Sequence, residues 1–228
     1  MAEERSSRQD ERSGERQQMV ERQIQARGIS APAVLDALAA VPRHRFVPEA
    51  LAPRAYDDTP LPIGYDQTIS QPYVVAYMTE AAALTPDAKV LDIGTGSGYQ
   101  AAVLAEIVSR VYSIEIVPEL ADRSRRLLAD LGYDNVEVRT GDGYRGWPEE
   151  APFDAIVVAA APDHVPPALV EQLAVGARLI IPVGRFTQEI LIVTRTADGS
   201  TTEAVLPVRF VPMTGEAQRP GRSQRPGR

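Results

Sequence analysis

The sequence predicts an α/β fold: a doubly wound, mostly parallel sheet with one added antiparallel strand and a small helical N-terminal extension. Three features of the chain indicate this class. Apolar runs alternate with helical patterns from Lys89 onward, a glycine-dense turn follows the first run, and the last two runs have no obvious helix between them. Alternating strands and helices are typical of parallel sheets, whereas two strands joined directly pair antiparallel.

Length and composition limit the class of protein. The 228 residues can hold one domain with a good core, and the hydrophobic share of 44% is ordinary for a soluble protein. No run approaches the roughly 20 apolar residues of a membrane span, and the polar N-terminus lacks the apolar segment of a signal peptide. We therefore expect a cytoplasmic protein without a membrane partner.

Charge and cysteine content exclude further classes. The formal charge of -7 argues against a nucleic-acid partner, because phosphate binding depends on clustered positive charge. Cysteine is absent, which excludes disulfides, thiolate metal sites and cysteine nucleophiles.

The chain is predicted to form a single domain over residues 19–215, flanked by disordered tails at 1–18 and 216–228. Both tails are polar and offer little apolar surface to bury. Within the domain, residues 19–85 are expected to form a helical and loop extension, and residues 86–215 the sheet.

The extension is predicted to hold short helices separated by irregular segments. The first helix covers 19–27, and Ser30 is the expected N-cap of a second. His44 lies between two arginines in an irregular connection, where an exposed or capping role is favoured over a catalytic one. Residues 53–72 carry four prolines and little periodicity, which predicts a long loop, and a helix over 73–84 follows.

Thr68 and Ser70 lie close to the expected N-terminus of that last helix. Backbone N–H groups and the helix dipole favour an anion at such a position. The residues alone leave two interpretations open, an anion-binding site or plain N-capping of the helix.

The sheet is predicted from seven apolar runs, at residues 90–93, 111–115, 136–139, 153–158, 178–183, 190–195 and 204–211. Helices are expected over 99–108, from 118 onward and over 166–173. Ligands of open α/β sheets bind at the carboxyl ends of the strands, so polar residues at those ends are the candidates for a site.

The glycine-dense turn supplies the first candidates. An acidic residue ends the first strand and small residues follow it: Asp92, Gly94, Thr95, Gly96, Ser97 and Gly98. A dinucleotide fingerprint needs Gly-x-Gly-x-x-Gly, but the third glycine here comes one residue early. Gly-x-Gly-x-Gly after an acidic residue suits S-adenosylmethionine, which brings no pyrophosphate to the helix N-terminus. A plain helix-entry turn is the alternative.

Two further strand ends carry a carboxylate. Glu115 ends the second strand, 21 residues beyond Gly94, where a carboxylate can accept hydrogen bonds from both ribose hydroxyls. Asp142, followed by Gly143, ends the third strand and is placed to accept from an adenine amino group. Three carboxylates at successive strand ends favour a nucleoside site over three unrelated turn residues.

Competing chemistries lack the residues they need. Lys89, the only lysine, belongs neither to the Gly-Lys-Ser/Thr of a P-loop nor to the Tyr-x-x-x-Lys pair of short-chain dehydrogenases. The motif of exocyclic-amine methylases is missing, and His44 and His164 have no partners at metal-ligand spacing, so no metal is expected.

A carboxylate acceptor would need no catalytic base, because with a pKa of about 4 it is already charged at neutral pH.

Seven segments together resemble the protein-L-isoaspartate O-methyltransferase family, and the similarity runs from about residue 19 to 214. The segments are Val41–Pro48, Gln67–Pro72, Asp92–Tyr99, Gly141–Gly143, Pro152–Asp154, Ile181–Gly184 and Val208–Pro212. The resemblance implies a Rossmann-like class I methyltransferase fold. It also implies methyl transfer from S-adenosylmethionine, with S-adenosylhomocysteine as product, to the α-carboxylate of isoaspartyl residues in damaged proteins and peptides.

The resemblance also assigns residues on the substrate side. Ser70 corresponds to the serine of the active site, and Thr68, Ile69 and Val211 would line the substrate groove. One position departs from the expected pattern, because Asp66 stands where a glycine is expected. Aspartate tolerates left-handed conformations, but its charge beside an anionic substrate can weaken binding.

Two other functions stay open at this point. One is a methyltransferase of the same fold that acts on a small carboxylate or hydroxyl. The other is a non-catalytic S-adenosylmethionine-binding module, which would keep Glu115 and Asp142 but would not need the Thr68–Ser70 loop. We expect a monomer, and neither the flanking preference of the substrate nor the role of the tails follows from the sequence.

Overall fold

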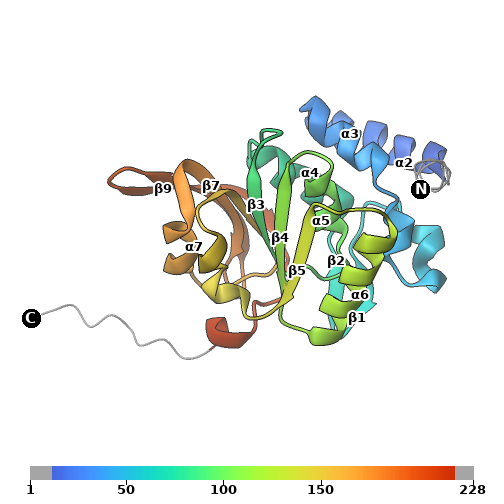
Figure 1. The fold of residues 1–228 in the computed structure, drawn as a ribbon. Helices are drawn as coiled ribbons and strands as arrows, with labels where there is room; N and C mark the ends of the chain where they lie inside the picture. The colour runs from blue at the N-terminus through green and yellow to red at the C-terminus, as the bar shows by residue number, and fades with distance from the viewer. Residues whose placement is uncertain (1–11, 219–228) are drawn as a thin grey trace, which may run out of the picture.

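A seven-stranded sheet forms the centre of the protein in the computed structural model, which describes residues 12–218 (Figure 1). Its strand order is β5-β4-β3-β6-β7-β8-β9. The strands are β3 Lys89–Ile93, β4 Arg110–Glu115, β5 Val136–Thr140, β6 Phe153–Val158, β7 Leu173–Val183, β8 Gln188–Thr196 and β9 Gly199–Val208. The first five of this order pair in parallel, and β8 runs antiparallel to both of its neighbours. The predicted fold class, with its added antiparallel strand, is therefore confirmed.

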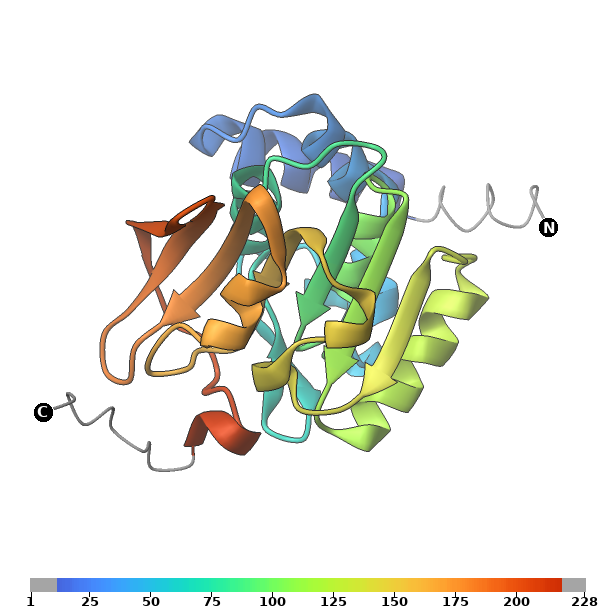
Figure 2. The same ribbon diagram turned by 60° about the vertical axis from the view of Figure 1, so that its left-hand side comes forward.

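Helices cover both faces of the sheet because successive strand residues point to opposite sides. In β3, Val90 belongs to one buried cluster and Leu91 to the other. The first cluster includes residues of α3 Pro32–Ala40, α4 Pro72–Ala81, α5 Tyr99–Ala105 and α6 Pro118–Asp130. The second cluster packs under α7 Pro167–Glu171 and the segments that lead into β6, on the opposite face (Figure 2).

The N-terminal extension begins earlier than the sequence predicts. One helical stretch runs through α2 Ser13–Met19, the π-helical η1 Val20–Ile24 and the 3-10 turn η2 Gln25–Arg27. The buried Arg16 donates from Nε to the carbonyl of Ala39. The predicted disordered tail over 1–18 is therefore wrong from residue 13 onward, and residues 1–11 lie outside the described part.

The folded domain also extends further toward the C-terminus than the sequence predicts. The 3-10 turn η7 Gly215–Gln218 follows the last strand, and Ala217 within it is buried. A disordered tail from 216 is therefore wrong over its first three residues, whereas 219–228 lie outside the described residues.

Two local predictions in the extension are also wrong. Ser30 is not the N-cap of α3, which follows Ala31 and starts with Pro32, whose missing N–H costs nothing at that position. The backbone N–H of Ser30 instead donates to Glu80 at 2.8 Å. His44 is buried, in the 3-10 turn η3 Arg43–Phe46, with Nδ1 2.7 Å from the hydroxyl of Tyr56.

The predicted long loop over 53–72 contains a β-hairpin. The strands β1 Leu61–Gly64 and β2 Gln67–Ile69 pair antiparallel, after the 3-10 turn η4 Glu49–Arg54. Tyr65 and Asp66 form the turn with φ angles of 55° and 57°, as a two-residue hairpin turn requires. Asp66 thus adopts the left-handed conformation that the sequence led us to expect, and its side chain is exposed at the tip.

The remaining elements agree with the prediction except at their ends. The helix expected over 73–84 is α4, and strand β7 starts several residues earlier than its apolar run. No helix within residues 12–218 is both long and apolar enough to cross a bilayer.

Candidate functional site

A cavity of about 800 Å³ lies where the parallel strands end. The β1–β2 hairpin and η7 lie at this same edge of the sheet (Figure 2). Most residues that the sequence singled out line this cavity: Thr68, Ile69, Ser70, Gly94, Thr95, Gly96, Ser97, Glu115, Asp142, Gly143 and Val211. The structure therefore brings the predicted cofactor and substrate residues together, while Asp92 and Gly98 lie outside the lining.

The turn after β3 is held by backbone hydrogen bonds to the neighbouring strand. The N–H groups of Gly94 and Thr95 donate to the carbonyl of Ile114 at 2.8 and 3.2 Å. At Gly96, φ is +53°, and a Cβ there would lie 3.4 Å from Cδ1 of Ile63 on the hairpin. Glycine at this position lets the turn adopt its conformation and lets the hairpin approach.

Glu115 ends β4 with its carboxylate fixed by two backbone donors. The N–H of Gly96 donates to Oε2 at 2.7 Å, and the N–H of Val117 donates to Oε1 at 3.0 Å. Only 5% of Glu115 is exposed. Because each carboxylate oxygen can accept more than one hydrogen bond, both oxygens keep capacity for a ligand in the cavity.

Asp142 ties two segments to the third strand end. It caps the 3-10 turn η5 Gly143–Arg145, because the N–H of Tyr144 donates to Oδ1 at 3.0 Å. The N–H of Glu216 in η7 donates to Oδ2 at 2.8 Å, and Glu216 also forms an ion pair with Arg145. Sequence reasoning missed this C-terminal contact because it placed residue 216 in a tail.

Asp92 lies beneath the glycine turn and does not line the cavity. It is completely buried, and Ser113 donates from its hydroxyl to Oδ2 at 2.7 Å. Burial raises the pKa of Asp92 to about 7, the hydrogen bond from Ser113 lowers it, and the charge of Glu115 raises it. Gly98, which the sequence assigned to cofactor binding, instead allows the turn to pack closely against α6, since a Cβ there would lie 3.3 Å from Leu128.

Ser70 lies between two cavities. A second cavity, of about 1150 Å³, adjoins the first and shares with it Thr68, Ser70, Ala159 and Val211. The hydroxyl of Ser70 makes no hydrogen bond to the described residues. The N-cap of α4 is Gln71, and no side chain of that residue caps the helix. Plain N-capping by Ser70, one of the two sequence interpretations, is therefore wrong.

Asp58 and Arg123 hold the segment that carries Ser70, and sequence reasoning missed both. Asp58 accepts from the side chain of Gln71 at 2.7 Å. Arg123 on α6 donates to the carbonyl of Ile63 on the hairpin at 2.8 Å. Neither contact has a sequence signal, because each joins residues that are more than ten positions apart.

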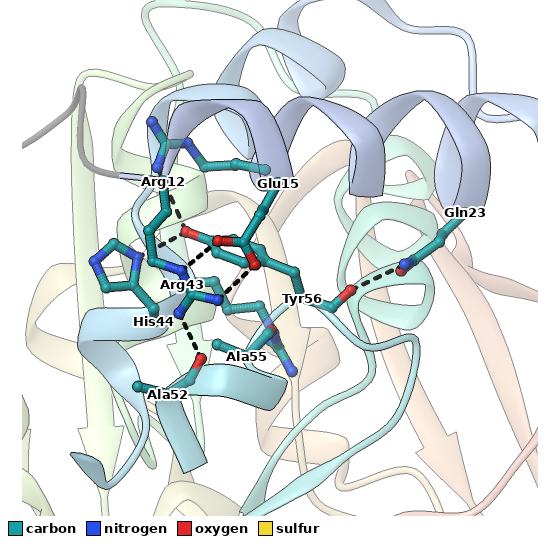
Figure 3. Close-up of polar contacts among 9 residues, drawn as sticks. Arg12, Glu15, Gln23, Arg43, His44, Ala52, Ala55 and Tyr56 are labelled. Atoms are coloured by element: carbon teal, nitrogen blue, oxygen red, sulfur yellow. Dashed lines mark hydrogen bonds and ion pairs between the residues drawn. The ribbon is translucent and has the colours of Figure 1, made fainter. Parts of the chain in front are cut away.

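A buried polar cluster lies in the N-terminal extension (Figure 3). The guanidinium of Arg43 stacks 4.8 Å from the ring centroid of Tyr99, and Nε donates to the carbonyl of Ala55 at 2.8 Å. Burial lowers the pKa of Arg43 and raises the pKa of Tyr99 to about 12. Tyr99 lines the cavity, so this cluster fixes part of its floor.

Figure 3 also shows how the start of α2 closes over this cluster. Arg12 pairs with Glu15 at 2.6 Å and donates to the carbonyl of Ala52 at 2.5 Å. The side chain of Gln23 donates to the carbonyl of Tyr56 at 2.9 Å. Within residues 12–218, no group of His, Cys, Asp and Glu side chains is placed to hold a metal ion.

Comparison with known proteins identifies relatives of this chain. A family model described as protein-L-isoaspartate(D-aspartate) O-methyltransferase (PCMT) matches residues 14–218. A protein-L-isoaspartate O-methyltransferase of Gloeobacter violaceus is 61% identical over 200 residues, which cover 87% of this chain and 98% of that protein.

Two solved structures are similar over most of the chain. One, a protein-L-isoaspartate O-methyltransferase, has a TM-score of 0.80 at 29% identity. The match covers 88% of this chain and 66%, just under two thirds, of that chain. The other is a Plasmodium falciparum protein described as a beta-aspartate methyltransferase (PCMT) in complex with S-adenosyl-L-homocysteine. Its TM-score is 0.77 at 27% identity, over 87% of this chain and 98% of that one.

Proposed function

The chain belongs to the protein-L-isoaspartate(D-aspartate) O-methyltransferase family, and we propose that its two adjoining cavities divide the reaction between them. The activity is transfer of a methyl group from S-adenosylmethionine to a carboxylate. The smaller cavity is assigned to the cofactor, and the larger one to the isoaspartyl segment of a damaged protein.

The residues of the smaller cavity fit the cofactor. Glu115 presents a buried, oriented carboxylate that suits the two hydroxyls of a ribose. Asp142 and Gly143 lie at the next strand end, where an adenine ring would lie against backbone. A Cβ at position 143 would collide with the side chain of Ile93, so glycine lets the backbone pack closely against Ile93 at this wall.

In the chemical step, the protein has to align and desolvate the acceptor carboxylate. S-adenosylmethionine supplies an electrophilic methyl group on a sulfonium. The acceptor carboxylate has a pKa of about 4 in solution and is charged at neutral pH, so no residue has to remove a proton from it. Ser70 and Thr68 donate hydroxyl hydrogen bonds that hold one acceptor oxygen in line, while Ile69 and Val211 exclude water.

One observation carries this assignment. The hydroxyl of Ser70 is free of other hydrogen bonds to the described residues, and it lies where the two cavities meet. A serine at a helix start normally caps the helix, so a free hydroxyl at this place is available to a ligand. The position of Asp66 supports the same assignment, because its exposed side chain lines neither cavity and adds no charge to their walls.

We also propose that the enzyme works as a cytoplasmic monomer. The absence of cysteine suits a reducing compartment. Few large apolar side chains are exposed within residues 12–218, and they come from separate elements: Tyr65, Ile116, Val175 and Phe186.

The test is methyl transfer to matched peptides. The protein is incubated with labelled S-adenosylmethionine and two peptides of one sequence, containing either isoaspartate or aspartate. We expect base-labile label on the isoaspartyl peptide alone. Label on small carboxylates or alcohols but on neither peptide would favour the broader methyltransferase. Cofactor binding without label on any acceptor would favour the non-catalytic module.

A further inference from the structure

The charge of the larger cavity is opposite in sign to that of the protein. The chain carries a formal charge of -7. Yet the charged side chains that line this cavity within residues 12–218 are two arginines, Arg27 and Arg209, and no carboxylate lines it. An acidic protein repels acidic segments at long range. Two arginines that line one groove therefore indicate that the groove itself favours acidic segments of a bound peptide.

Arg209 provides an uncompensated charge on one wall. It directly follows β9, is exposed, and its guanidinium makes no ion pair or hydrogen bond with residues 12–218. The backbone of the next residue, Phe210, is held by the side chain of Gln188, which accepts from its N–H at 2.6 Å and donates to its carbonyl at 3.2 Å. The chain is therefore anchored next to Arg209, while the hydrogen-bond donors of its guanidinium stay available.

Arg27 provides a second, preorganised charge in the lining of the groove. Its guanidinium lies 3.4 Å from the ring centroid of Tyr73 and 2.7 Å from Oδ2 of Asp58. Asp58 is shared among several donors, since it also accepts from the side chain of Gln71 and from the N–H of Tyr73. Stacking and the ion pair hold the guanidinium in one place, and 45% of the side chain stays exposed.

We infer that these two arginines make the groove selective for isoaspartyl segments with acidic side chains next to the isoaspartyl residue. The inference rests on the proposed function, because it places the peptide in the larger cavity. Both guanidinium groups lie at a solvated rim, where one ion pair is worth about two- to fivefold in affinity. Such pairs weaken as salt rises, because the Debye length falls to about 3 Å at 1 M.

The experiment compares isoaspartyl peptides that share one sequence and carry Glu, Gln or Lys on both sides of the isoaspartyl residue. At low salt, we expect kcat/KM to fall in the order Glu, Gln, Lys, with about a two- to fivefold change at each step. The ratio between the Glu and Lys peptides should shrink toward one in 0.5 M salt. Equal values for the three peptides at low salt, or the reverse order, would overturn the inference.

Variants assign the effect to the groove. Arg209→Gln should narrow the Glu-to-Lys ratio by about two- to fivefold, whereas Arg209→Lys, which keeps the charge, should retain the ratio. Arg126→Gln on α6 makes the same charge change at an exposed position that lines neither cavity, and it should leave the ratio unchanged. If Arg126→Gln narrowed the Glu-to-Lys ratio as much as Arg209→Gln, the assignment to the groove would be overturned, because the net charge of the protein would then explain the order of the three peptides.

The two levels of the proposal fail in different ways. If no isoaspartyl peptide is methylated, the proposed function fails and the flanking preference fails with it. If all the peptides are methylated with equal efficiency, the function stands and only the inference about Arg27 and Arg209 is refuted. Arg27→Gln gives an independent measurement at the second arginine, and an unchanged Glu-to-Lys ratio in both glutamine variants would also refute the inference.

Discussion

The replacement of Glu115 by glutamine tests the cofactor half of the site. The change keeps the shape of the side chain but turns one oxygen into an amide donor. Both oxygens of Glu115 now accept from backbone N–H groups, those of Gly96 and Val117. Whichever way the glutamine amide turns, its NH₂ group faces the backbone N–H of either Gly96 or Val117. The variant therefore loses one backbone hydrogen bond and also one acceptor for the ribose.

The expected loss follows from the charge of the acceptor. A hydrogen bond to a charged group contributes about 1.5–3 kcal/mol. At about 1.4 kcal/mol for each factor of ten, the loss of one such bond to the ribose raises the Kd of S-adenosylhomocysteine by roughly ten- to 150-fold. The glycine turn would shift as well, because the N–H of Gly96 would lose its acceptor.

Calorimetry with two ligands separates the direct contact from the effect on the turn. The wild type should bind a 2′-deoxy analogue of S-adenosylhomocysteine more weakly than the parent compound. Glu115→Gln should bind both with nearly equal, reduced affinity if the carboxylate contacts that hydroxyl. Glu119→Gln, an exposed control that lines neither cavity, should match the wild type. Unchanged affinity in Glu115→Gln would remove this residue from the site.

Three further substitutions test other parts of the structure. Ser70→Ala removes the acceptor donor, so kcat/KM for an isoaspartyl peptide should fall about ten- to hundredfold, while affinity for S-adenosylhomocysteine stays within about twofold. Gly215→Ala should weaken cofactor binding in calorimetry, because φ is +77° there and a Cβ would collide with Oδ2 of Asp142. Asp92→Asn should flatten the pH dependence of stability. Burial raises the pKa of Asp92 from 3.8 to about 7, so the native state retains a proton that the unfolded chain releases near pH 4. This stabilisation is complete below that pH and is lost as pH rises to 7. The free energy of unfolding of the wild type should therefore fall, relative to the asparagine variant, by roughly 4 kcal/mol over this range.

Each of these predictions has an outcome that contradicts it. Normal turnover in Ser70→Ala would deny that serine a role in holding the acceptor. Full cofactor affinity in Gly215→Ala would show that η7 is not coupled to the site through Asp142. Parallel curves of unfolding free energy against pH, measured by urea denaturation of the wild type and Asp92→Asn, would show that Asp92 is ionised in the native state.

The sheet could be predicted from the sequence because its signals are local. Apolar runs, their lengths and the glycine turn lie within short windows, and parallel strands bring their carboxyl ends to one edge. Glu115 and Asp142 were found by this rule alone, and the structure places both at the cavity. The hairpin was missed because its strands are short, Pro62 interrupts β1, and the turn is Tyr65–Asp66 instead of a glycine-containing pair.

The start of the first helix, before residue 19, was missed for a different reason. Residues 12–18 are mostly polar, and polar segments usually remain solvated. Their order depends on distant partners: Arg16 contacts the carbonyl of Ala39, and Arg12 contacts that of Ala52. Arginine can be buried when its donors are satisfied, but nothing within the segment itself identifies those acceptors.

Other non-local contacts position the β1–β2 hairpin against the glycine turn. Ile63 packs against Gly96, and its carbonyl accepts from Arg123, so the hairpin is anchored to the glycine turn and to α6 at one residue. Strand β2 leads from that hairpin directly to Ser70. A shift of the glycine turn would therefore move the acceptor loop with it, because the hairpin rests on the turn. In-line methyl transfer depends on the distance between acceptor and cofactor, so under the proposed assignment the packing at Ile63 would link the two cavities into one reaction site.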